Sequence, residues 1–178
     1  MNLLKGKKSG ITIIEGLIVF AAAIALVATG LALYKNLQNS GNIKNETTNI
    51  ASIIKRVTEV FGEDDMSSLV ITDFINAGVY APGTRIISDV VYNAWNGTIV
   101  ITPTAEATWD LTYTRVPVGD ACIDLVSNTR KIGFDNINIS GGNGAMDKDV
   151  TDIIPTDITS ACSEDGGNNE VTIVWSND

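Results

Sequence analysis

The sequence contains no histidine among its 178 residues and only two cysteines. Catalytic triads, histidine-ligated zinc and acid–base chemistry by imidazole are therefore excluded. Basic residues are also few, because 12 Lys and Arg stand against 21 Asp and Glu, which gives a formal net charge of -9 at pH 7. A chain with so little basic surface is poorly suited to hold a phosphate backbone, so we do not expect nucleic acid as its primary ligand.

Catalytic motifs are missing from the sequence as well. It has no phosphate-binding glycine loop, no paired catalytic carboxylates and no nucleophile elbow. We therefore predict a protein that is not an enzyme and that binds no cofactor and no metal. Asp147, Asp149 and Asp152 offer oxygen ligands of the kind that calcium prefers. The EF-hand spacing is absent, however, and a solvated acidic loop is the simpler interpretation of these three residues.

A long stretch without charge lies near the N-terminus. The segment from Gly16 to Tyr34 contains no Asp, Glu, Lys or Arg, and as an α-helix it would extend about 29 Å, enough to span a bilayer core. Lys5, Lys7 and Lys8 precede it, which predicts a cytoplasmic N-terminus and an acidic remainder across the membrane. A cleaved secretory signal peptide and an uncleaved anchor share these features, although the stretch is longer than the apolar region of a signal peptide.

Glu15 stands at the entrance of this stretch. A carboxylate at the edge of a hydrocarbon segment costs on the order of 2 to 3 kcal/mol and usually has a partner. Cleavage between Gly10 and Ile11 would place a new α-amino group four residues before Glu15, one helical turn away on the same face. A simple anchor does not explain the carboxylate, whereas proteolysis would supply a cation for it.

The order of residues around Glu15 resembles the processing site of type IV prepilins. The matching residues are Lys7-Lys8-Ser9-Gly10, followed by Ile11-Thr12-Ile13-Ile14-Glu15 and an apolar helix. The resemblance implies that a prepilin peptidase cuts after Gly10 and methylates the amino group of Ile11. It also implies that Glu15, with Thr12, serves subunit assembly by neutralising the terminal amine of a neighbouring copy. Ile11 departs from the Phe, Met or Leu common in the family.

The same resemblance implies partners and a location. The precursor would lie in the bacterial inner membrane, contact the peptidase and the pilus assembly machinery there, and leave as one copy in a helical homopolymer. Outside the bilayer the apolar segment has to be covered, because its burial is favoured by about 25 cal/mol per Å², and identical helices provide that cover. The resulting extracellular pilus, or fimbrium, would meet the surface of a host or a neighbouring cell.

Apolar residues recur at helical spacing beyond Lys35. The recurring positions are Ile43, Ile50, Ile54, Val57 and Phe61, with Lys44, Glu46, Lys55, Arg56 and Glu59 between them. The first proline is Pro82, so we predict one helix from Ile11 to Phe61 whose second half packs on a globular head. The alternative is two helices with a hinge at Ser40-Gly41-Asn42.

The expected organisation has four parts. A leader peptide occupies 1–10, a transmembrane and polymerisation helix 11–35, an amphipathic half of the helix 36–61, and a globular head 62–178. From Gly62 onward the composition changes to Gly, Asn, Asp, Ser and Thr with short apolar runs, which is typical of an α+β head. The predicted fold class is α+β, with a long N-terminal helix packed on an antiparallel sheet.

Short alternating patterns locate the elements of the head. Strands are predicted at Thr98–Thr102, Trp109–Tyr113, Ile132–Ile139 and Val171–Trp175. One helix is predicted to begin with Ser67 or Ser68 as its cap and to run through Ile75, and another to begin with a cap at Asp120. Of the three tryptophans, Trp109 and Trp175 lie in alternating strand patterns, so we expect Trp95, Trp109 and Trp175 in the core and not on a carbohydrate-binding surface.

Cys122 and Cys162 are the two cysteines of the chain. The predicted topology places both outside the cytoplasmic membrane, where disulfides persist, so we expect them to be paired. In type IV pilins a disulfide near the C-terminus bounds the variable D-region, and this pair resembles it. The segment between the cysteines contains Gly141-Gly142-Asn143-Gly144, and we expect it to be mostly loop and displayed on the filament surface.

Three further segments are similar to the type IVb pilins of enteric pathogens and of conjugative thin pili. They are Tyr92-Asn93-Ala94-Trp95-Asn96-Gly97-Thr98, Asp120-Ala121-Cys122, and Ala161-Cys162 with the turn that leads to Val171. The function implied is a structural subunit, the major pilin of a type IVb pilus, that serves adhesion, aggregation or conjugative contact. The alternatives are a minor pilin or a type II secretion pseudopilin, and a membrane-anchored periplasmic binding domain.

Overall fold

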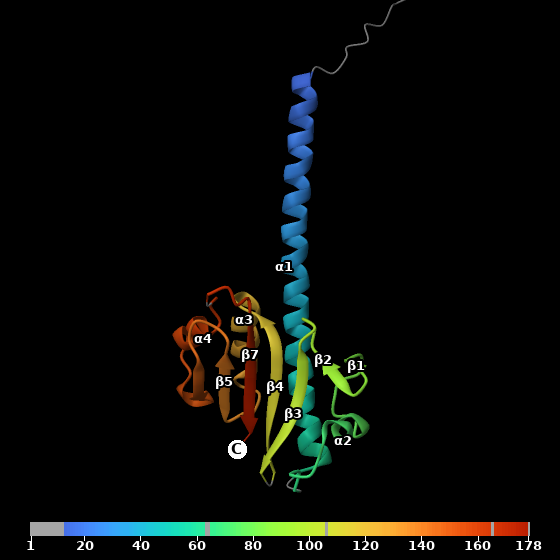
Figure 1. The fold of residues 1–178 in the computed structure, drawn as a ribbon, viewed down its shortest axis with the longest axis vertical. Coiled ribbons are helices and arrows are strands. Elements are labelled where there is room, and N and C mark those ends of the chain that lie inside the picture. Colours follow the sequence, from blue (N-terminus) through green and yellow to red (C-terminus); the bar gives the residue numbers. More distant parts are fainter. Residues whose placement is uncertain (1–12, 63–64, 106, 165, 178) are drawn as a thin grey trace, which may run out of the picture. The chain divides into compact units, whose positions relative to one another are not determined.

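The computed structural model describes residues 13–62, 65–105, 107–164 and 166–177, and Figure 1 shows their fold. The chain forms two compact units, one that ends at Asn39 and one that runs from Ser40 to Asp178. Helix α1 (Ile13–Val60) contributes to both units. Its helical backbone continues through Ser40, Gly41 and Asn42, so the prediction of one long helix is confirmed and the two-helix alternative is wrong.

The part of α1 that belongs to the head buries one face. Ile43, Ile50, Ile53 and Val57 are buried, and these positions follow the three- and four-residue steps of an amphipathic helix. Ile54, which the sequence pattern placed in the stripe, is only partly buried, and its neighbour Ile53 is fully buried instead. The predicted amphipathic stripe is therefore correct in its spacing and wrong by one residue at this turn.

The head contains one antiparallel sheet of seven strands in the order β1-β2-β3-β4-β7-β5-β6. The strands are β1 (Arg85–Ile87), β2 (Val90–Tyr92), β3 (Thr98–Ala105), β4 (Thr108–Pro117), β5 (Asn136–Ser140), β6 (Met146–Asp149) and β7 (Glu170–Asn177). The C-terminal strand β7 pairs with β4 on one side and β5 on the other. The end of the chain therefore joins the first four strands to the last two.

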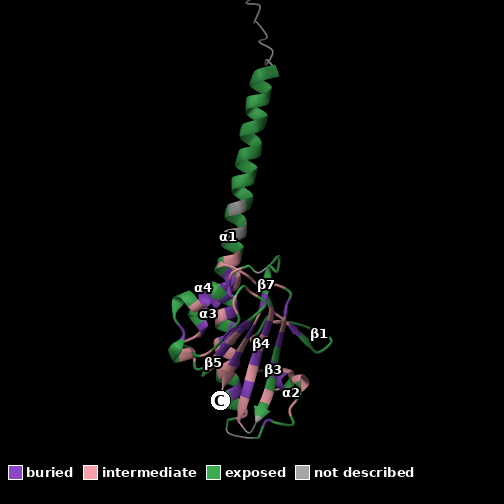
Figure 2. Cartoon of the chain, turned by 60° about the vertical axis from the view of Figure 1, so that its left-hand side comes forward, coloured by how far each residue is buried: buried purple, intermediate pink, exposed green. Residues whose placement is uncertain are grey.

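Side chains alternate across this sheet, as Figure 2 shows for its central strands. In β4, Trp109, Leu111 and Tyr113 are buried, and the residues between them are half-buried. The same alternation holds for Ile137 and Ile139 in β5 and for the apolar residues of β7. One face of the sheet thus packs on α1 and α3, which confirms the predicted helix-on-sheet architecture.

In the described part of the head, three helices and a 3₁₀ turn complete the fold. They are α2 (Ile71–Asn76), α3 (Asp120–Thr129), η1 (Val150–Asp152) and α4 (Pro155–Ala161). Ser67 and Ser68 form a turn and do not cap α2; instead the carboxylate of Asp73 accepts a hydrogen bond from the amide of Val70 at 2.8 Å. Asp120 is the first helical residue of α3, and Gly119 is its cap. The predicted serine and aspartate caps are therefore wrong.

Several elements have no counterpart among the predictions. The β1–β2 hairpin turns at Ser88 and Asp89, both with positive φ (49° and 62°), a backbone that aspartate tolerates and serine rarely adopts. Strand β6 is short and mostly polar. Helix α4 begins at Pro155, where the fixed φ of proline suits the first helical turn.

The core confirms the expectation for two of the three tryptophans. Trp109 and Trp175 are buried, and Trp175 lies edge-on to Tyr113 with ring centroids 5.4 Å apart. The indole Nε1 of Trp175 donates a hydrogen bond to the hydroxyl of Thr129 at 3.0 Å. Trp95 is only partly buried and packs at the margin of the core. None of the three presents an exposed ring for a sugar.

Candidate functional site

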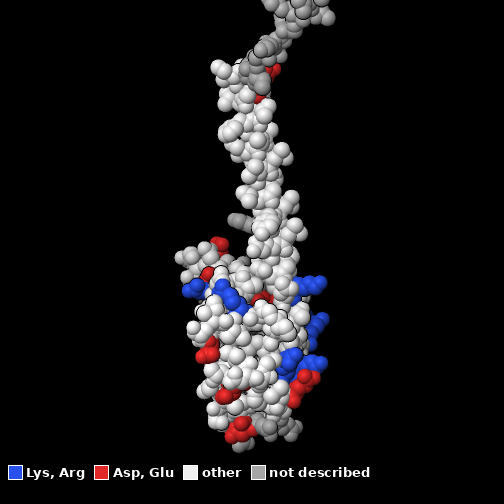
Figure 3. Space-filling model, turned by 90° about the vertical axis from the view of Figure 1, so that its right-hand side faces the viewer, with Lys and Arg blue, Asp and Glu red and all other residues white. Residues whose placement is uncertain are grey.

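The first part of α1 exposes apolar side chains on every side. In the unit that ends at Asn39, the described side chains from Ile13 to Leu31 are exposed, and Figure 3 shows this stretch as uncharged along most of its length. Its 19 residues are long and apolar enough to cross a membrane by length and composition, a test that a signal sequence also passes. An apolar surface of this kind requires lipid or other apolar helices around it.

Within this stretch, the hydroxyl of Thr29 is bonded to the helix itself. The hydroxyl of Thr29 donates to the carbonyl oxygen of Ala25 at 2.6 Å, so the side chain presents its methyl group outward. A Cβ added at Gly16 or Gly30 would meet nothing within 4 Å. Another helix is therefore sterically free to approach at both glycines, as in helix pairs within membranes.

The residues predicted for processing lie at the start of the chain. Gly10, Ile11 and Thr12 are outside the described residues. Glu15 is described, and it lies in the first turn of α1, where a carboxylate interacts favourably with the positive end of the helix dipole. The cleavage, the methylation and the assembly role of Glu15 stay predictions.

In the head, a buried carboxylate joins α1 to the sheet. Glu46 is only 6% exposed. One of its oxygens accepts a hydrogen bond from the amide of Ala94 at 2.6 Å, and the other accepts one from Asn49 Nδ2 at 3.4 Å. Asn49 also lies 3.5 Å from the hydroxyl of Tyr113 and accepts a hydrogen bond from the amide of Ala81 at 3.4 Å. Glu46 and Asn49 together therefore connect α1 to the turn at Ala94, to Tyr113 of β4 and to the segment at Ala81.

The turn that presents the Ala94 amide is shaped by Asn93. Its Oδ1 accepts hydrogen bonds from the amides of Trp95 and Gly97 at 3.0 and 2.9 Å, and its Nδ2 donates to the carbonyl oxygen of Thr114 at 2.8 Å. A Cβ at Gly97 would lie 1.8 Å from that carbonyl oxygen, so this position requires glycine. The motif Asn93 to Gly97 is therefore a structural support for Glu46.

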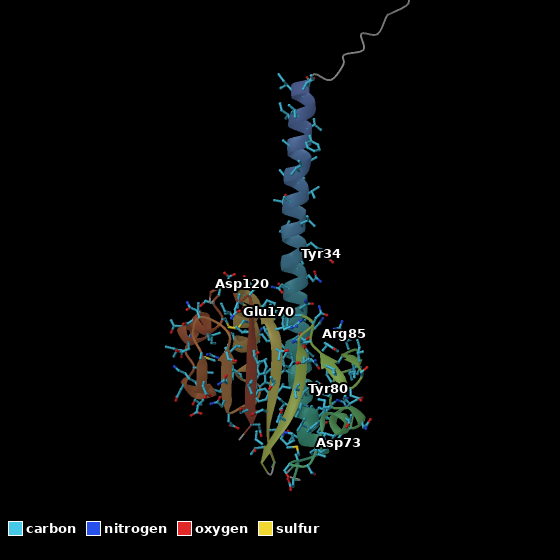
Figure 4. All side chains as sticks on the ribbon, viewed as in Figure 1. Tyr34, Asp73, Tyr80, Arg85, Asp120 and Glu170 are labelled. Carbon is cyan, nitrogen blue, oxygen red and sulfur yellow. A yellow bond between two sulfur atoms is a disulfide. The ribbon has the colours of Figure 1, made fainter. Side chains whose placement is uncertain are left out.

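An open groove of about 640 Å³ lies beside this junction. Its lining includes Lys44 and Glu46 from α1, the connection from Ala81 to Arg85, and Tyr92 from β2. The guanidinium carbon of Arg85 lies 4.4 Å from the ring centroid of Tyr92, a cation–π contact that holds Arg85 flat against the sheet. Figure 4 shows Arg85 at the start of the β1–β2 hairpin, at the end of the sheet away from β5.

Burial changes the proton affinity of this junction. It raises the pKa of Glu46 above its ordinary value of 4.5, against the opposing effect of hydrogen bonds from Ala94, Asn49 and Tyr113. Burial also raises the pKa of Tyr113 well above 10.0, and the nearby charge of Glu46 adds to that shift. Because removal from water penalises the charged form, the folded head binds the Glu46 proton more tightly than the unfolded chain does.

Glu46→Gln is expected to change how the free energy of unfolding depends on pH. Since the pKa of Glu46 is raised in the folded state, its contribution is most favourable below pH 4.5 and is lost as pH rises through the folded-state pKa. The free energy of unfolding of the wild type minus that of Glu46→Gln should therefore decline as pH rises from about 4 and then level off. Urea unfolding at a series of pH values measures this, with Glu59→Gln, exposed on the same helix, as the matched variant. If the difference in the free energy of unfolding between the two proteins grew as pH rose, the pKa of Glu46 would not be raised in the folded state.

The disulfide Cys122–Cys162 closes the second part of the head. The two Cα atoms are 5.6 Å apart and the residues are 40 positions apart in sequence. Both side chains are fully buried. The amide of Gly119, which precedes α3, donates to the carbonyl oxygen of Cys162 at 2.7 Å, so the start of α3 and the end of α4 are joined twice. The predicted pairing is confirmed.

The region between the cysteines is not mostly loop, which corrects the prediction. It contains most of α3, then β5, β6, η1 and α4. The side chains of Ile137 and Ile139 in β5 are fully buried on the inner face of the sheet. A Cβ at Gly142 would lie 1.9 Å from the carbonyl oxygen of Ala161, so the glycine-rich segment is held closely against α4. Display of this region on a filament stays a prediction.

The three aspartates considered for calcium are not on a loop either. Asp147 and Asp149 belong to β6 and Asp152 to η1, around a hollow of about 420 Å³. Lys148 lies among them and pairs with Asp157 at 2.8 Å, and this ion pair lowers the pKa of Asp157. Among the residues that the structure describes, no group of three or more acidic or thiol side chains is arranged to hold a metal ion.

The sequence interpretation missed Glu46, which it counted among the polar residues between the stripe positions. A signal was present, because Ile43, Glu46, Ile50, Ile53 and Val57 follow one another at steps of three and four. A carboxylate at such a position lies on the face that packs on the sheet and needs donors there. Asn93, in the motif that the sequence did single out, places one of those donors.

Comparison with known proteins places this architecture in a family. A model described as the PilS N-terminal family matches residues 40–176. The chain belongs to this family. A comparison with curated proteins finds no match. The match covers the head from residue 40 onward, and it does not include the apolar part of α1 before that residue.

Two solved structures share the pilin fold. The type IV b pilin from Salmonella typhi has a TM-score of 0.61 and 23% sequence identity, over 76% of this chain and 99% of that one. TcpA, a type IV pilin from the Vibrio cholerae El Tor biotype, has a TM-score of 0.51 and 13% identity, over 78% of this chain and 99% of its own. The chain is therefore a PilS-family pilin with a type IVb fold, and pilins are structural proteins that self-assemble.

Proposed function

We propose that this pilin is the structural subunit of a type IVb pilus, made as an inner-membrane precursor, cleaved after Gly10 and assembled through its N-terminal helix. The observation that carries the proposal is the exposed apolar stretch from Ile13 to Leu31 at the start of a PilS-family pilin. A soluble chain would not leave such a surface uncovered. The bilayer covers it in the precursor, and copies of the same helix cover it in the filament.

Cleavage supplies the charge for assembly. Removal of residues 1–10 by a prepilin peptidase leaves the amine of Ile11 four positions before Glu15. In the filament, the Glu15 carboxylate of one copy accepts the methylated amine of the next copy, and Thr12 lies within the same helical turn. The pairing lowers the cost of moving both charges out of the membrane interface into an apolar helix bundle.

The head then faces outward and makes the contacts of the filament. The region bounded by Cys122 and Cys162 is built of strands and helices and keeps its shape outside the cell, where disulfides persist. This region serves adhesion, aggregation or conjugative contact with a host or neighbouring cell.

Glu15→Gln tests the assembly role. The substitution keeps the size of the side chain and removes its charge, so cleavage should continue while the filament yield falls about tenfold or more, as expected for the loss of a few kcal/mol per subunit. Filament protein in the sheared fraction and processed protein in the membrane are measured on the same cells. Glu59→Gln, the same substitution on the exposed side of α1 in the head, should leave both unchanged. Normal yield from Glu15→Gln would refute the pairing.

A further inference from the structure

The head contains two asparagines that are followed by glycine, in the pairs Asn96-Gly97 and Asn143-Gly144. Asparagine is a chemically labile residue. An asparagine that precedes glycine loses its side-chain amide most easily, because glycine has no side chain to hinder the approach of its main-chain nitrogen. Both asparagines are exposed. The sequence alone does not distinguish the two pairs, so a difference in their reactivity has to come from the fold.

The fold hinders this reaction at Asn96. The amide of Gly97 is the group that would attack the side chain, and it donates a hydrogen bond to Oδ1 of Asn93 at 2.9 Å. Gly97 is also buried, and a Cβ built on it would collide with the main-chain carbonyl group of Thr114 in β4. The nitrogen of Gly97 is therefore held in place by a hydrogen bond and by close packing.

The main chain around Asn143 is arranged differently. The amide of Asn143 donates to the carbonyl oxygen of Ser163 at 3.1 Å, and Gly142 before it packs on the carbonyl oxygen of Ala161. Within the described parts of the chain, the amide of Gly144 and the side chain of Asn143 have no hydrogen-bond partner. The chain is thus fixed up to Asn143, and the amide immediately after it is free to react.

The surroundings of Gly144 also leave it room to move. The atom nearest to a Cβ built on Gly144 is the hydroxyl oxygen of Ser160, at 3.0 Å. Ser160 is exposed near the end of α4, so its hydroxyl group can turn aside, whereas a main-chain carbonyl group such as that of Thr114 cannot. Asn143 is exposed and Gly144 is half-buried, so water reaches the pair.

We propose that Asn143 is a site of deamidation, and that the fold protects Asn96 from the same reaction. The amide nitrogen of Gly144 bonds to Cγ of Asn143, the bond from Cγ to Nδ2 breaks, and Nδ2 takes up the proton of the amide and leaves as ammonia. The product is a succinimide ring. A water molecule then opens the ring, at Cγ to give aspartate or at the main-chain carbonyl carbon to give isoaspartate.

The reaction changes the charge and the shape of the region between Cys122 and Cys162. Either product adds a carboxylate to a chain whose formal net charge is already -9. Isoaspartate also lengthens the main chain, directly after the amide that bonds to Ser163. The reactants are the chain and water alone, so the inference goes beyond the proposed function and does not depend on it. In a filament, the modified fraction would increase with the age of the subunit.

Peptide mass spectrometry of the folded protein tests the site. The full-length chain in detergent is kept at mildly alkaline pH, which favours the deprotonated amide, and samples are digested with trypsin at intervals. Cleavage after Lys and Arg places Asn143 in the peptide 132–148 and Asn96 in the peptide 86–115. The mass increase from amide to acid should appear at Asn143 at least about tenfold faster than at Asn96, because a buried hydrogen bond has to break before Gly97 reacts.

Unfolding of the chain provides the matched comparison. In guanidinium chloride with the disulfide reduced, both pairs lose their surroundings, so Asn96 and Asn143 should react at similar rates. Equal rates at the two asparagines in the folded protein would overturn the proposal. A folded Asn143 that reacts at least about tenfold more slowly than the unfolded one would also overturn it, because the fold would then protect both pairs.

Asn143→Gln is the control variant for the site. Glutamine has to close a larger and slower-forming ring, so the peptide 132–148 should stay unmodified over the same interval, while the peptide 86–115 behaves as in the wild type. The peptide 132–148 also contains Asn136 and Asn138 of β5. If its mass still increased in Asn143→Gln, the reaction would belong to one of these residues and the proposal would be wrong.

Fibres sheared from cells test whether the product accumulates on the filament. Subunits are labelled with a heavy amino acid for a short time, and fibres are collected after increasing intervals. The deamidated fraction of the labelled subunits should rise with the interval in the wild type and stay at its starting value in Asn143→Gln. A constant fraction in the wild type would overturn the accumulation. Absence of fibres, with normal deamidation of the purified chain, would refute only the proposed function.

Discussion

Gly10→Val is expected to leave residues 1–10 attached and to abolish surface filaments. The prepilin resemblance places the cut after a residue without a side chain, and valine adds a branched one at the scissile bond. With the leader attached, no amine forms at Ile11, and the three lysines of the leader stay on the cytoplasmic side of the membrane. Mass spectrometry of the membrane protein and electron microscopy of the surface measure the two effects.

Gly6→Val makes the same substitution inside the leader and should be processed normally. Filaments built from uncleaved Gly10→Val protein would show that the amine of Ile11 has no part in assembly. A Gly10→Val chain cut at its usual place would show that the peptidase does not depend on this glycine.

Joint replacement of Cys122 and Cys162 by alanine is expected to lower the free energy of unfolding of the head by about 4 kcal/mol. The residues are 40 positions apart, and a cross-link of that span restricts the unfolded chain by about this amount in the chain-entropy model. The removed sulfur atoms are fully buried, so lost contacts add to the effect. Urea unfolding followed by the fluorescence of the buried Trp109 and Trp175 measures the change.

Reduction of the wild-type disulfide provides the matched comparison, because it opens the bond without substituting any residue. It should cause a similar loss. If the reduced protein unfolded at the same urea concentration as the oxidised one, the disulfide would make no contribution to the stability of the head.

The sequence predicts those elements of the fold whose apolar residues recur with one period and all lie on one buried face. The steps of three and four residues from Ile50 to Val57 specify the buried side of α1, and the two-residue steps in β4 and β7 specify the inner face of the sheet. The pairing of Cys122 with Cys162 follows from their number and topology. In each of these cases one local rule determines the outcome.

Other parts depend on contacts that no local pattern contains. Strand β6 is short and polar, and it is a strand because β5 offers it an edge. The insertion of β7 between β4 and β5 joins residues that are distant in sequence. Glu46 is buried because the turn after β2 brings the Ala94 amide to its carboxylate. Gly119, and not Asp120, is the cap of α3, and its amide bonds to the carbonyl oxygen of Cys162, a residue that is distant in sequence.

The most direct measurement is electron microscopy of fibres sheared from the cell surface, combined with N-terminal sequencing of their subunit. The account predicts fibres whose subunit begins at a methylated Ile11. Fibres of another protein, or a chain that begins at Met1 and stays singly in the membrane, would contradict it.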